Sequence, residues 1–91
     1  MKLSDAKRQL DEISHDTFEA AYTSHIFSIK AASPARNEIQ FRLSSNIARL
    51  RADEESDVYK AVLSDIHLCF TMGWLPEASY KRAINIMEEL V

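Results

Sequence analysis

The chain has 91 residues, of which 46% are hydrophobic and 27% charged, which is the composition of an ordinary globular domain and not of a disordered segment. One glycine and two prolines are too few for the many turns of a β-sandwich or a barrel. The single cysteine excludes an internal disulfide framework, and a formal net charge of −3 disfavours a nucleic-acid binder. We therefore expect one all-α domain that covers residues 1–91.

The distribution of charge along the chain bears on its location. One of the longest stretches without a charged residue runs from Ile66 to Pro76. It is much shorter than the roughly 20 residues that cross a bilayer. The N-terminal residues also lack the apolar run of a signal peptide. The sequence predicts a cytoplasmic protein with no membrane partner.

The first half of the chain carries three helix signals. A first helix is expected over residues 4–14. A second is expected to begin at Asp16, because Asp16 followed by Glu19 three residues later resembles a capping box. This second helix would continue to about Ala32. Ser33 and Pro34 then predict a cap and the first residue of a third helix.

The second half contains a charged interruption and one glycine. The hydrophobic pattern lapses near Asp53, which predicts a short link and a new helix, although one long helix over residues 35–72 stays open because no glycine or proline interrupts it. Gly73 is expected to end the fourth helix, and Pro76 to open a fifth. Because the connections are short, neighbouring helices should run antiparallel. The predicted fold is a compact antiparallel bundle of four to five helices.

Three aromatic residues lie outside the main apolar stripes. Phe27 and Phe41 each point away from the stripe of their own helix. Such a face either packs in a central position with helices on both sides, or forms a contact surface for a partner or a second copy. Trp74, in the predicted turn, either holds that turn to the core or presents an anchor to a partner.

Two ionisable residues fall within apolar stripes. His25 and Asp65 need polar partners, because an unpaired buried charge is costly, and we expect them to form a structural pair across the bundle. Asp65, His67 and Cys69 are two residues apart on a helix, so they cannot close around one metal ion. The sequence predicts no catalytic residue, no metal site and no cofactor.

Clusters of arginine and acidic residues follow one another in the middle of the chain. We place Arg36, Arg42 and Arg49 on the polar flank of the third helix, so they form no inward cage for an anionic substrate. The acidic residues that follow are here called the acidic segment: Asp53, Glu54, Glu55 and Asp57. They either complement the dipole of a helix N-terminus or dock into a basic groove on another protein.

The expected function is non-enzymatic binding of another protein, as in immunity or inhibitor proteins that block a basic, nucleic-acid-handling partner. The expected contact residues are the acidic segment with Phe27, Phe41 and Trp74. A structural or regulatory homodimer that pairs the Phe27 and Phe41 faces is the main alternative. A helix-turn-helix DNA regulator built around Gly73 is a further alternative, although Glu77, Glu88 and Glu89 on its last helix oppose contact with phosphate.

Overall fold

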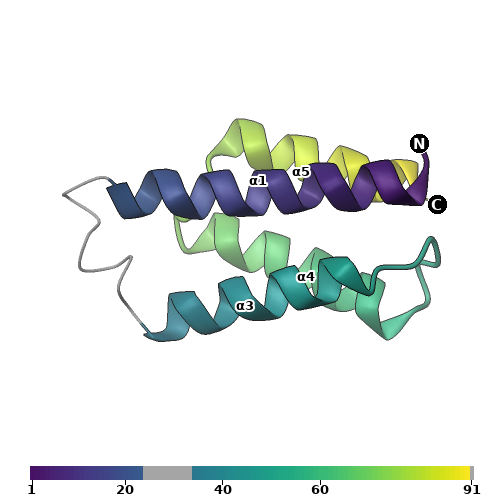
Figure 1. Cartoon of the computed structure of the whole chain (residues 1–91), viewed down its shortest axis with the longest axis horizontal. Coiled ribbons are helices and arrows are strands. Elements are labelled where there is room, and N and C mark those ends of the chain that lie inside the picture. Colours follow the sequence, from purple (N-terminus) through teal and green to yellow (C-terminus); the bar gives the residue numbers. More distant parts are fainter. Residues whose placement is uncertain (24–33, 91) are drawn as a thin grey trace.

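The computed structural model describes residues 1–23 and 34–90, and within them the side chains of residues 1–15 and 36–90. Its helices are α1 (Leu3–Thr23), α3 (Pro34–Ala48), α4 (Asp57–Thr71) and α5 (Glu77–Glu89), with no strand in the described ranges. The four helices lie along the long axis of the molecule and alternate in direction (Figure 1). The all-α antiparallel bundle is therefore confirmed.

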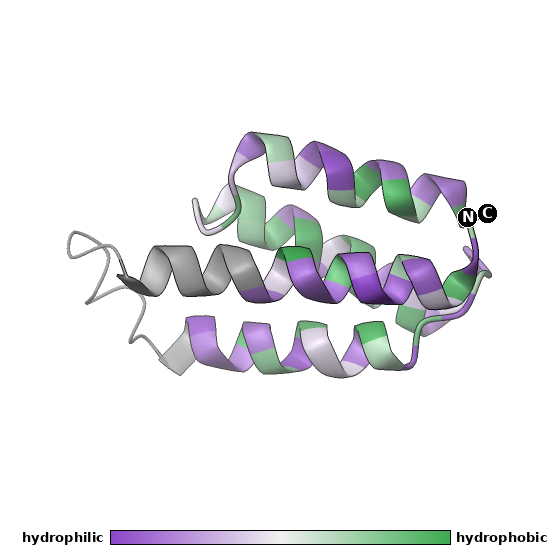
Figure 2. Cartoon of the chain, turned by 45° about the horizontal axis from the view of Figure 1, so that its top comes forward, coloured by the Kyte–Doolittle hydropathy of each residue, from purple (hydrophilic) through white to green (hydrophobic). Residues whose placement is uncertain are grey.

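Each helix packs against two neighbours. The contacts run from α1 to α3, from α3 to α4, from α4 to α5 and from α5 back to α1, so the described helices form a closed square. Hydrophobic and hydrophilic residues alternate along the coloured parts of the helices (Figure 2), and most of the described large hydrophobic residues are buried or partly buried. The buried core draws residues from all four helices, from the turn before α5 and from the positions just after α3 and α5: Ala6, Leu10, Ile13, Leu43, Ile47, Leu50, Tyr59, Val62, Ile66, Cys69, Trp74, Leu75, Ala83, Ile86, Met87 and Leu90.

The first helix differs from its prediction. The chain remains helical through Asp16, so the predicted end near residue 14 and the predicted start at Asp16 are wrong. A capping-box pattern does not end a helix by itself, and no glycine or proline occurs before Pro34 to force a stop. The second predicted helix is thus partly the C-terminal part of α1, and its remainder from residue 24 lies outside the described residues.

The predicted break near residue 53 is confirmed. Helix α3 ends at Ala48, where the Nζ of Lys7 on α1 donates a hydrogen bond to the Ala48 carbonyl over 2.9 Å. Helix α4 begins after Ser56, whose hydroxyl accepts a hydrogen bond from the Tyr59 N–H at 3.1 Å. These contacts are a C-terminal and an N-terminal cap, which explains how the chain turns without glycine or proline.

The turn at Gly73 has the geometry of a Schellman motif. Gly73 has a positive φ of 77°, its N–H donates to the Phe70 carbonyl at 3.0 Å, and the Trp74 N–H donates to the Cys69 carbonyl at 2.9 Å. In this motif the residue after the glycine packs back on the last helical turn. Gly73 therefore ends α4 as predicted, and the same geometry directs Trp74 toward the core.

Candidate functional site

The acidic segment forms an ordered turn between α3 and α4. The Ser56 N–H donates to the Asp53 carbonyl at 3.0 Å, and the Glu55 N–H donates to the Asp53 carboxylate at 3.0 Å. All four acidic side chains are exposed. A backbone contact and the Asp53 carboxylate hold the turn, and the carboxylates of Glu54 and Asp57 remain available to a partner.

Part of the acidic segment is already neutralised. Glu55 lies 3.7 Å from the Nζ of Lys60, and both side chains are well exposed. Glu54 makes no ion pair with a described residue, and neither does Glu88 near the end of α5. Burial raises the pKa of Tyr59, and the negative charges of Glu54 and Glu88 raise it further. The two carboxylates therefore act on the same phenol, which links the acidic segment to the C-terminal part of α5.

Of the three aromatic residues predicted to contact a partner, the structure describes the positions of Phe41 and Trp74. Phe41 is 76% exposed on the outer face of α3, so it is available for contact. Phe27 lies outside the described residues. Trp74 is only 8% exposed and packs in the core, so of the two alternatives for this residue the structure supports attachment of the turn to the core. Trp74 is therefore removed from the set of contact residues.

The partner of Asp65 is an arginine of α3. Asp65 is 4% exposed, and its two carboxylate oxygens accept hydrogen bonds from Arg42, at 2.6 Å from Nη2 and 3.0 Å from Nε. This hydrogen bond and the charge of Asp65 raise the pKa of Arg42. The predicted partner, His25, lies outside the described residues. The sequence correctly marked Asp65 as a residue that needs a partner, but the two hydrogen bonds come from Arg42.

Arg36 is buried, so its predicted position on the polar flank of α3 is wrong. It is only 2% exposed, and burial lowers the pKa of its guanidinium. The spacing contains a signal for this burial, because Arg36, Leu43 and Leu50 are seven residues apart and therefore share one face of the helix. The prediction treated Arg36 as exposed because arginine is a charged residue, although its spacing indicates a buried position. The long side chain enters the core.

An exposed aromatic cluster between α4 and α5 was not predicted. The rings of Phe70 and Tyr80 stack, with centroids 4.2 Å apart and an angle of 9° between their planes. The Tyr80 hydroxyl lies 2.6 Å from the Nδ1 of His67. The Thr71 hydroxyl donates to the His67 carbonyl at 2.9 Å, within the last turn of α4. The aromatic cluster, defined as His67, Phe70 and Tyr80, joins the two helices at their surface.

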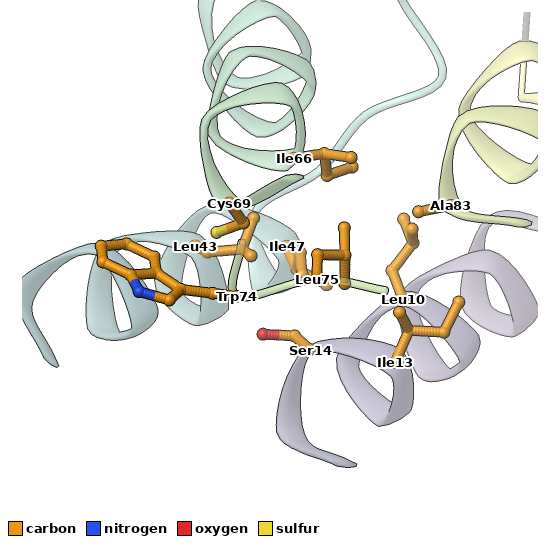
Figure 3. A pocket seen from close by; sticks show the side chains of 10 residues that line it. All are labelled: Leu10, Ile13, Ser14, Leu43, Ile47, Ile66, Cys69, Trp74, Leu75 and Ala83. Carbon is orange, nitrogen blue, oxygen red and sulfur yellow. The ribbon is translucent and has the colours of Figure 1, made fainter. Parts of the chain in front are cut away.

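The core contains a small cavity lined by residues of all four helices and of the turn before α5 (Figure 3). Its volume is about 10 Å³, close to that of one water molecule, and most of its lining is apolar. Ser14, Cys69 and Trp74 are the lining residues with polar side-chain atoms, and the Ser14 hydroxyl is buried with no hydrogen-bond partner in the described part of the chain. Burial raises the pKa of the Cys69 thiol to about 11. A cavity of this size and chemistry is a packing defect and not a substrate site.

In the described part of the chain, no group of three His, Cys, Asp or Glu residues could hold a metal ion. None of the helices there is both long and apolar enough to cross a membrane. Helices α4 and α5 run side by side in opposite directions (Figure 1), whereas helix-turn-helix motifs cross at about 90–120°. Comparisons with protein-family models, curated proteins and solved structures gave no match.

Proposed function

We propose that this protein acts by binding another protein that presents a basic surface, and that it catalyses no reaction. The observation that carries the proposal is the acidic segment, whose four side chains are exposed on an ordered turn. An ordered turn reduces the entropy lost on binding, and complementary charge accelerates encounter and selects partners. This proposal corresponds to the class expected from the sequence, immunity or inhibitor proteins that block a basic, nucleic-acid-handling partner.

A cytoplasmic location belongs to the same proposal. Cys69 is buried as a free thiol, and its raised pKa keeps it in the unreactive protonated form. A chain with one buried thiol and no disulfide suits a reducing compartment. Fractionation of host cells tests this location directly.

The proposal is tested by reversing charge in the acidic segment. The triple variant Asp53→Lys, Glu54→Lys and Glu55→Lys should lose the basic partner that the wild-type protein captures from a host lysate. Mass spectrometry identifies that partner, and circular dichroism should show unchanged helicity, because these residues lie before α4. Purified partner then gives the affinity ratio, which we expect to exceed tenfold.

A matched control separates local charge from net charge. The variant Asp11→Lys, Glu12→Lys and Glu38→Lys changes the total charge by the same amount at exposed positions on α1 and α3. It should retain the partner. If both triple variants bind as the wild type does, the acidic segment is not the contact surface and the proposal is wrong.

A homodimer is a second candidate function, and the 76% exposure of Phe41 favours it. Large exposed aromatic side chains are typical of contact surfaces. Sedimentation equilibrium of the wild type and of Phe41→Asp distinguishes the two candidates. A stable dimer that dissociates in the variant supports the homodimer, and a monomer in both supports the basic partner. For the DNA-binding alternative, duplex binding should fall steeply with salt.

A further inference from the structure

The aromatic cluster is ordered before any partner arrives. The Phe70 and Tyr80 rings stack at 4.2 Å, and the Tyr80 and His67 rings meet edge to face at 5.4 Å with an angle of 62°. The hydrogen bond between the Tyr80 hydroxyl and the Nδ1 of His67 further fixes the tyrosine ring. Phe70 nevertheless keeps 38% of its surface exposed. A pre-ordered aromatic surface binds with little additional loss of side-chain entropy.

Carboxylates that form no ion pair with a described residue lie at the other end of this pair of helices, Glu88 on α5 and Glu54 in the link before α4. We call the outer surface between α4 and α5 the α4–α5 seam. It runs from the aromatic cluster toward the end of the helix pair where the buried Tyr59 donates its hydroxyl hydrogen to the Met87 carbonyl at 2.9 Å. Glu54 and Glu88 act on Tyr59 at that end. Tyr59 and Phe70 are eleven positions apart, which is about 16 Å along a helix, a separation that one protein interface covers.

Two lysines of α4 and α5 are already paired with carboxylates. Lys60 lies 3.7 Å from Glu55, and Lys81 lies 3.3 Å from Glu77. No described residue forms an ion pair with Glu54 or Glu88. The charge available to a partner on this surface is therefore negative, and the exposed aromatic surface attracts cations through its π electrons.

We propose that the α4–α5 seam binds an arginine-bearing segment of the basic partner, with a guanidinium placed on the ring of Phe70 and further cations directed toward Glu54 and Glu88. This inference rests on the proposed function and adds the surface and the side-chain chemistry that it recognises. Arginine is specified over lysine, because its planar guanidinium stacks on aromatic rings and is less strongly hydrated. The contact anchor is then Phe70 and not Phe41.

Two synthetic peptides of equal length and charge, hexa-arginine and hexa-lysine, test this proposal by nuclear magnetic resonance titration of the full chain at low salt. Hexa-arginine should bind about two- to fivefold more tightly than hexa-lysine, which is the ratio expected of one exposed cation–π contact. Its largest backbone amide shifts should occur at His67, Phe70 and Tyr80. The variants Phe70→Ala and Phe70→Leu should both lose the preference, and Phe70→Leu retains an apolar side chain and should keep the fold intact.

Phe41→Ala is the matched control, since it removes an exposed phenylalanine from α3 and should keep the arginine preference. An equal affinity for the two peptides, or a preference that persists in both Phe70 variants, overturns the aromatic contact. Peptides that lack this aromatic contact can still bind through the acidic segment, in which case the lysine triple variant abolishes their binding. That result overturns the contact with Phe70 and leaves the proposed function in place. Failure of the wild type to bind either peptide overturns both proposals.

Discussion

The ion pair between Arg42 and Asp65 offers the most direct test of how α3 and α4 are held together. We predict that Arg42→Met, which keeps the aliphatic part of the side chain, lowers the free energy of unfolding by about 2 kcal/mol. The Asp65 side chain is 6% exposed and accepts two hydrogen bonds from Arg42. Without Arg42, this carboxylate stays buried with neither hydrogen bond.

The magnitude follows from the exposure of the two partners. Removing one partner of a fully buried pair costs about 3–5 kcal/mol. The Arg42 side chain is 48% exposed, so water screens part of the interaction and enters the space that the guanidinium leaves. We therefore reduce the figure to about 2 kcal/mol, which corresponds to a fall of about 8–16 °C in the melting temperature of a domain of this size.

Urea unfolding followed by fluorescence measures this change. Trp74 is the only tryptophan and lies in the core, so its emission reports loss of packing. Urea is preferred to guanidinium chloride because a salt would screen the charges. The double variant Arg42→Met with Asp65→Asn removes the buried charge and should recover about 1 kcal/mol relative to Arg42→Met. A loss below about 0.5 kcal/mol in Arg42→Met would refute the reasoning.

Three further predictions concern the core and the turn. Ser14→Ala should raise the melting temperature slightly or leave it unchanged, because it removes a buried hydroxyl without a hydrogen-bond partner; a loss above 1 kcal/mol would reveal a hidden partner. Cys69 should resist a thiol reagent at pH 8 and react on unfolding, since burial raises its pKa to about 11; rapid labelling of the folded chain contradicts this. In urea unfolding, Gly73→Ala should lower the free energy of unfolding by about 1 kcal/mol and Gly73→Asn by less. The cause is backbone strain alone, because φ is 77° and no neighbour lies within 4 Å of an added Cβ. Equal stability of the wild type and both variants would count against this cause.

Most of the fold could be predicted because local signals agreed with the hydrophobic pattern. At Gly73 the glycine, the end of the apolar stripe and Pro76 all indicated one turn. Near Asp53 the lapse of the pattern was sufficient, and Ser56 supplied the cap. At Asp16 the cap-like residues had no supporting break, and the helix continued.

The candidate site was less predictable, because it depends on which helices become neighbours. Asp65 could be identified as a residue in need of a partner, but the choice of Arg42 requires knowing that α3 packs against α4. The stacking of Phe70 on Tyr80 likewise joins two helices across a turn. The burial of Arg36 could be predicted from the sequence, because Arg36 lies seven residues before the buried Leu43 and so shares its face of the helix.

The placement of the chain ends affects how binding experiments should be designed. The start of α1 and the end of α5 lie at the same end of the bundle as the link that carries the acidic segment (Figure 1). An affinity tag or fusion partner on either terminus would stand beside those carboxylates, and a polyhistidine or lysine-rich tag could cover them. A long neutral spacer, or immobilisation through a cysteine introduced on the outer face of α1, leaves that surface accessible.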